Sequence, residues 1–264
     1  MTVYLNFARK SFQKQMAYRF EYFVGIFNGF LFIFIFTSLW KAVFLQADES
    51  SRAGFTMETI LAYAVFAMIL KISFTQDDMM TSQKIRTGAM AMDLIKPIKY
   101  MYMSFSECIG QSVFHWFSRS LPLLIFSVFL FDISLPTDPA RYYYLLVSGT
   151  FGYLILFQIN FLIGLLAFWF IENFAFQLMK FSLITLFSGA ILPVDFFPSY
   201  LQGFISWIPF KYIFYVPTAI FTGHMTGPPV FESIFRQFIW IIVLYIFAEW
   251  MWKRGSAKLV IQGG

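Results

Sequence analysis

The residues best suited to chemistry form a row of polar side chains within an apolar stretch, spaced four apart: Glu107, Gln111, His115 and Arg119. On an α-helix this spacing places them on one face, each roughly above the last. Arg119 is expected near the midplane of a membrane, where a charged side chain must face protein or water. The row predicts either a wetted translocation path or gate, or a structural row that pairs with Gln158, Asn160 or another chain.

The short motifs of hydrolytic and redox enzymes are absent from the sequence. There is no GxSxG, HExxH or CxxC, and two histidines with the single Cys108 do not favour a metal site. The phosphate-binding GxxxxGK[ST] loop is also absent, since no lysine follows a glycine. The chain therefore does not hydrolyse ATP by the P-loop mechanism. We expect no catalytic residue, metal or cofactor here; any ATP and Mg²⁺ would be bound by a partner ATPase.

The composition is that of a membrane protein. Hydrophobic residues make up 59% of the chain and charged residues 12%, against roughly 45–50% and about 25% in soluble domains. The net charge of +5 comes from basic residues in the gaps between apolar blocks. That distribution sets membrane orientation and does not suit nucleic acid, which needs a dense basic surface.

Six stretches have the roughly 20 mainly apolar residues that a transmembrane helix needs. They are 21–45, 57–76, 104–131, 142–169, 174–193 and 231–252. Their even number places both termini on one side. With the termini inside, the inner segments hold thirteen Lys and Arg residues and the outer segments five, so both termini are expected in the cytoplasm. The expected fold is an all-α integral membrane protein with one transmembrane domain over 1–264.

Two further segments are not predicted to span the membrane. Residues 1–20 are amphipathic and predict a helix lying on the inner membrane face. Six of the ten prolines fall between residues 193 and 229, and the two apolar pieces there, 199–208 and 210–222, are too short to cross. The region 194–229 therefore predicts two short re-entrant or extracellular helices before the last span.

The longest inner connection, 77–100, is charged and contains a helix-sized piece at Ala89–Ile95, between a possible break at Gly88 and a stop at Pro97. It is either an ordinary loop or a knob that docks in a groove of an ATPase. The residues assigned to such coupling are Arg86, Gly88, Met90, Asp93, Leu94 and Pro97, with Glu172 of the next inner loop as a minor contact.

Small residues predict close helix packing at two places. Gly25 and Gly29 form a GxxxG in the first span, and Ser182, Thr185 and Gly189 form a strip on the fifth. Packing within the chain and dimerisation both remain open.

Three stretches resemble a known family. They are Arg86-Thr-Gly88 with Leu94-Ile-Lys-Pro97; Ser188–Pro198 followed by Ile208-Pro-Phe210, Tyr215-Val-Pro217 and Gly223; and Trp252-Lys-Arg-Gly255 with Val260–Gly264. In this order they are similar to the ABC transporter permease subunits of type-2 exporters, in particular to six-span drug and antimicrobial exporters. The resemblance implies an interfacial helix, a cytoplasmic coupling helix, two short extracellular helices, and a dimer of permeases with two ATPase subunits in a bacterial plasma membrane.

The sequence thus predicts the membrane subunit of an ATP-driven exporter of an amphipathic or hydrophobic substrate, such as a drug, peptide, lipid or glycan. Its partners would be a separate ATPase, a second identical or related permease, and membrane lipid, but no nucleic acid. The alternatives are a membrane enzyme acting on lipid-linked substrates, with His115, Glu107 and Arg119 as its site, and a non-catalytic scaffold.

Overall fold

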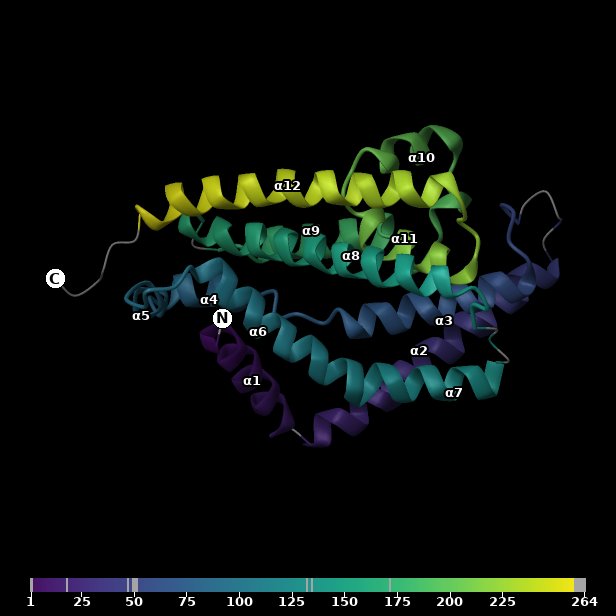
Figure 1. Cartoon of the computed structure of the whole chain (residues 1–264), viewed down its shortest axis with the longest axis horizontal. Coiled ribbons are helices and arrows are strands. Elements are labelled where there is room, and N and C mark those ends of the chain that lie inside the picture. The colour runs from purple at the N-terminus through teal and green to yellow at the C-terminus, as the bar shows by residue number, and fades with distance from the viewer. Residues whose placement is uncertain are drawn as a thin grey trace.

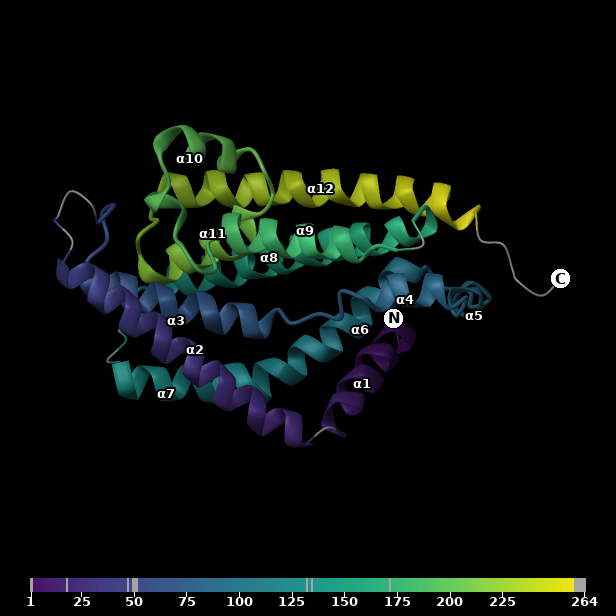
Figure 2. The same ribbon diagram turned by 180° about the vertical axis from the view of Figure 1, so that it is seen from behind.

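The computed structural model describes residues 2–17, 19–46, 48, 52–131, 133, 135–170 and 172–258. Within these ranges the chain is helical and contains no strand, so the all-α class is confirmed. Most helices run along the long axis of the molecule (Figures 1 and 2). The C-terminal end of α12 and the short α5 lie toward one end, and the C-terminal end of α2 lies at the other.

Among the described residues, four continuous helical stretches are long and apolar enough to cross a membrane, or five if the bent pair α10–α11 counts as one span. They are α2 (Arg19–Gln46); α6 (Tyr100–His115), which continues through the π-helix η2 (Trp116–Ser120) into α7 (Leu121–Phe131); α8 (Pro139–Leu165) with the 3₁₀ turn η3 (Leu166–Phe168); and α12 (Pro228–Ser256). Asp138 caps α8 and Pro139 lies in its first turn. Proline is favoured there because the backbone N–H that it lacks would have no partner within the helix.

Two predicted spans are shorter than the hydropathy pattern suggested. α3 (Met57–Ser73) has 17 residues and α9 (Phe174–Phe187) has 14. At 1.5 Å per residue they measure about 25 and 21 Å, against a hydrocarbon core of about 30 Å. The helices end at Ser73 and Phe187, before the span ends predicted at about residues 76 and 193.

α9 ends early because other elements satisfy the carbonyl groups that follow it. The Tyr63 hydroxyl of α3 donates to the Gly189 carbonyl at 2.7 Å, and the Tyr215 N–H donates to the Ser188 carbonyl at 2.8 Å. Gly189 itself has φ +79°, a conformation that only glycine adopts easily. The predicted strip is consequently not a helical surface, because Gly189 lies beyond the helix that carries Ser182 and Thr185.

The two short helices predicted before α12 are present as α10 (Ser199–Ser206) and α11 (Lys211–Thr222), which meet at 109°. α11 is not a peripheral piece. Ile213, Val216 and Ala219 are fully buried, and α11 packs on α8 and α3. Gly152 of α8 makes this possible, since a Cβ there would lie 2.5 Å from the Ile213 carbonyl oxygen.

α1 (Thr2–Met16) packs alongside α6 (Figure 1). The Ser11 hydroxyl donates to the Glu107 carbonyl at 2.7 Å, and Gly110 lets the α1 backbone approach. The first-span glycines also pack within the chain: a Cβ on Gly25 would collide with the Arg119 side chain, and one on Gly29 would lie 2.6 Å from Leu123 Cδ1. The GxxxG face is thus occupied by η2 and α7.

Candidate functional site

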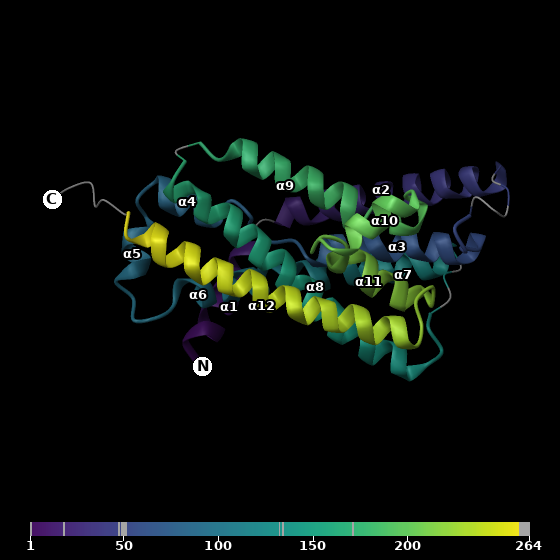
Figure 3. The same ribbon diagram turned by 90° about the horizontal axis from the view of Figure 1, so that it is seen from above.

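The connection 77–100 contains two short helices, α4 (Met80–Arg86) and α5 (Met90–Leu94), which we call the hairpin. It lies at the same end of the molecule as the C-terminal end of α12 (Figure 3). The predicted single helix Ala89–Ile95 is shorter than expected and is preceded by one that was not expected. Gly88 joins the two with φ +73°, and a Cβ added to it would meet no atom within 4 Å. Glycine is therefore favoured at position 88 because of its positive φ and not because space is short.

The inner side of the hairpin is fixed to the helix bundle. Met90 is 0% exposed, and Thr81 of α4 packs so closely on α8 that a Cβ on Gly164 would lie 2.8 Å from Thr81 Cβ. The Tyr100 hydroxyl donates to Thr81 Oγ1 at 3.3 Å. Met90 was expected to dock on a partner; instead it anchors the hairpin to its own chain.

Asp93 is the electrostatic anchor of the hairpin. Its carboxylate lies 2.6 Å from Lys96 Nζ and 3.0 Å from Lys84 Nζ, and Lys84 also reaches Glu107 at 3.5 Å. Burial raises the pKa of Asp93, but hydrogen bonds from Lys96 and Lys84 outweigh it and lower the pKa below its ordinary value of 3.8. The carboxylate is thus ionised at neutral pH and turned toward its own chain, which corrects its expected place at a docking surface.

The outer side of the hairpin is apolar and exposed. Met92, Leu94 and Ile95 form this docking face, with exposed fractions of 68%, 44% and 77%. Three exposed apolar side chains thus lie next to one another in a charged connection, and exposed apolar patches of this kind mark contact sites.

Charged groups and a groove border the docking face. Arg86 lies 3.5 Å from Glu172, so the segment before α9 meets the hairpin. A groove of about 550 Å³ runs between α5 and the end of α12, with Leu94, Pro97 and Lys253 in its lining. A partner seated on the docking face would also reach this groove.

The chain between α3 and α4 forms a polar junction, residues 75–78, that binds three other helices. The Ser112 hydroxyl of α6 donates to the Thr75 carbonyl at 2.8 Å, and the Asp77 N–H donates to Gln111 Oε1 at 2.9 Å. Asn160 of α8 donates to Gln76 Oε1 at 3.1 Å. Buried amides need such partners, and the junction supplies them.

The third attachment of the junction is to α9. Lys180 is 4% exposed, and its ammonium lies 2.5 Å from Asp78 Oδ2. Gln177, one turn earlier, donates to the Asp78 carbonyl at 3.2 Å. The junction was not predicted from the sequence; its signal was an Asp-Asp pair directly after an apolar stretch, with one lysine inside a later apolar stretch.

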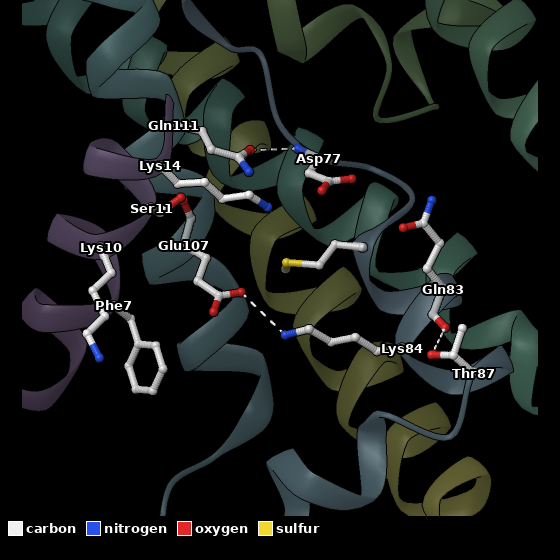
Figure 4. A pocket seen from close by; sticks show the side chains of 11 residues that line it. Phe7, Lys10, Ser11, Lys14, Asp77, Gln83, Lys84, Thr87, Glu107 and Gln111 are labelled. Atoms are coloured by element: carbon white, nitrogen blue, oxygen red, sulfur yellow. Dashed lines mark hydrogen bonds and ion pairs between the residues drawn. The ribbon is translucent and has the colours of Figure 1, made fainter. Parts of the chain in front are cut away.

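Glu107 and Gln111, the first two residues of the polar row, line a cavity of about 490 Å³ between α1, α4 and α6 (Figure 4). Glu107 faces Lys84 across it, and Gln111 binds the Asp77 backbone. Lys10 and Lys14 of α1 also line the cavity. These residues therefore face a polar, cation-rich space beside the hairpin.

His115 and Arg119, the last two residues of the row, do not line this cavity. His115 is buried and its Nδ1 has no hydrogen-bond partner among the described residues. The π-helix η2 widens the next turn, and Arg119 donates instead to the Glu21 carbonyl of α2 at 3.1 Å. Its guanidinium thus reaches the first turn of α2. The suggested partners lie elsewhere, since Gln158 donates to the Ile241 carbonyl and Asn160 to Gln76.

The geometry does not favour the enzymatic alternative. Glu107 and His115 are eight residues apart on α6, about 12 Å along its axis, and Arg119 is turned toward α2. No single substrate atom can be reached by all three groups.

One protein family matches most of the chain. A family model described as ABC-2 family transporter protein matches residues 29–263. No curated protein and no solved structure gives a significant match. The matched range includes the hairpin, the junction and the whole of α12.

Proposed function

The chain belongs to the ABC-2 family of transporter proteins, and we propose that it is the membrane subunit of an ATP-driven exporter in a bacterial plasma membrane. A separate ATPase docks on the α4–α5 hairpin, and a second identical or related permease completes the transporter. The substrate is an amphipathic or hydrophobic molecule such as a drug, peptide, lipid or glycan. Both termini lie in the cytoplasm.

The docking face is the observation that best supports this proposal. A permease without a P-loop receives ATP-driven motion only through a contact with its ATPase. Met92, Leu94 and Ile95 offer an apolar centre for that contact, and protein interfaces concentrate their energy in such centres. Met90 and Asp93 hold the hairpin on the bundle, so a push on the face moves the hairpin as a unit and is not absorbed by a flexible loop.

The junction gives that motion a route. α4 follows Asp78 directly, and residues 75–78 hold α6, α8 and α9 through polar contacts of 2.5–3.2 Å. Displacement of the hairpin therefore acts on three helices together. The six-span arrangement follows if α3 and α9 cross the membrane with their non-helical continuations, which are covered by α11 and satisfied by protein partners.

Purification of the full chain from its native membrane in mild detergent tests the proposal. We expect an ATPase subunit with a Walker motif to copurify, and its ATP hydrolysis to differ between the free and the permease-bound state. A chain that purifies without any ATPase under conditions that preserve other membrane complexes would contradict the proposed function.

Membrane orientation is tested by thiol labelling. Thr226 is exposed in the α11–α12 connection and Thr87 is exposed in the hairpin, while the native Cys108 is buried. In intact cells a membrane-impermeant maleimide should label the Thr226→Cys chain and spare the Thr87→Cys chain, because basic residues favour the inner side. Opening the cells should make Thr87→Cys reactive. The Cys108→Ser chain controls for background, and labelling of Thr87→Cys from outside would reverse the orientation.

A further inference from the structure

A groove between α8 and α12 is not used by the proposed function. The two helices lie side by side along their length (Figures 1 and 3). Near the end of α12 they enclose about 510 Å³, a volume within the range of small-molecule sites. Leu162 and Met251 form a buried floor, while Phe247 and Trp250 are about half exposed. The lining of the groove is therefore largely apolar, as a surface that faces lipid would be.

One end of this groove is cationic. Among the described residues, Arg254 and Lys258 are the only ionisable ones in its lining. Both are held over aromatic rings: the Arg254 guanidinium lies 5.6 Å from the Trp250 ring centre and Lys258 Nζ lies 5.4 Å from that of Trp169. Cation–π contacts of this kind fix the position of a charge. Tryptophans also favour the membrane–water boundary, so the cations mark the level of lipid headgroups.

Beside the cations, α12 packs closely on η3. Gly255 of α12 packs on Phe168 of η3, where a Cβ would lie 2.8 Å from the ring carbon Cγ. α12 and η3 therefore cannot slide apart without losing this contact. The two cation–π contacts favour the positions of both cations, which lowers the cost of ordering them when a ligand binds.

We infer that this groove binds one anionic phospholipid from the leaflet on the hairpin side. The acyl chains lie along Leu162, Phe247 and Met251, and the phosphate lies between Arg254 and Lys258. The charge and the apolar length together select this ligand: a zwitterionic lipid leaves the cations less well matched, and a free phosphate leaves the apolar floor uncovered. The inference depends on membrane insertion but not on ATPase docking.

Lipid binding to the purified full chain tests the inference. In detergent, native mass spectrometry with phosphatidylglycerol and phosphatidylcholine should show preferential retention of phosphatidylglycerol. Basic residues near a membrane surface contribute about 1 kcal/mol each, so the Arg254→Gln/Lys258→Gln chain should bind phosphatidylglycerol about 30-fold more weakly. The matched control is Lys99→Gln/Lys253→Gln, which removes the same charge from the neighbouring groove beside α5 and should bind as the wild type does.

Two further measurements distinguish a lipid site from a site for free phosphate and from a general effect of charge. Leu166→Trp narrows the apolar part of the groove and keeps both cations, so it should also weaken phosphatidylglycerol binding. Inorganic phosphate should not compete with the lipid. Equal binding of the two lipids, an equal effect of the control variant, or full competition by inorganic phosphate would each overturn the inference.

Discussion

Leu94→Asp and Ile95→Asp chains should insert and fold as the wild type does but lose most of their affinity for the ATPase. Both side chains are exposed in the isolated chain, so the substitution costs little there. At the centre of an interface the same carboxylate must be desolvated without a partner. Truncating a central interface residue commonly costs at least about 2 kcal/mol, which corresponds to roughly 30-fold in Kd.

Binding is measured by copurification and by titration of the solubilised chain with its ATPase. Tyr200→Asp is the matched control, because Tyr200 is 77% exposed, as Ile95 is, but lies on α10, away from the hairpin. Met90→Asp is the opposite case: its site is fully buried, so the chain itself should be destabilised. Wild-type ATPase affinity in both the Leu94 and Ile95 variants would show that the hairpin is an ordinary connection and not the docking site of the ATPase.

The long helices could be predicted because their signal is local. α2, α8 and α12 follow from apolar stretches longer than a bilayer requires, and the break before α5 follows from Gly88. The orientation of Met90 could not be predicted, because α5 has five residues and such a helix has too little periodicity to distinguish an inner from an outer face.

Long-range contacts account for the other differences. α9 stops at Phe187 because Tyr63, distant in sequence, binds the Gly189 carbonyl. The even spacing of the polar row assumed a regular α-helix, and the π-helix at Trp116–Ser120 breaks it. The burial of α11 depends on Gly152 in another helix. None of these contacts leaves a repeat or motif in the sequence.

The second large effect is expected at the junction, where Asp78 and Lys180 connect the hairpin to α9. Lys180 is buried and Asp78 is 44% exposed. Asp78→Asn alone leaves a buried ammonium without its counter-charge and should destabilise the chain by about 3 kcal/mol, the lower end for a buried pair, because Asp78 keeps access to water. The double variant Asp78→Asn/Lys180→Met removes both charges, so it should fold while losing the ionic contact between α9 and the junction.

The double variant separates docking from transmission. The docking face is untouched, so the ATPase should bind and hydrolyse ATP as before, but α9 should no longer follow the hairpin. Spin labels at Thr87→Cys and Ser182→Cys, in a Cys108→Ser chain, report the hairpin–α9 distance with and without ATP. The nucleotide-dependent change should be present in the parent complex and largely lost in the double variant. Glu232→Gln/Arg236→Gln removes an exposed pair on α12 and should change nothing, since such pairs contribute little. If the double variant retains the full distance change, motion reaches α9 by another route and the junction only stabilises the fold.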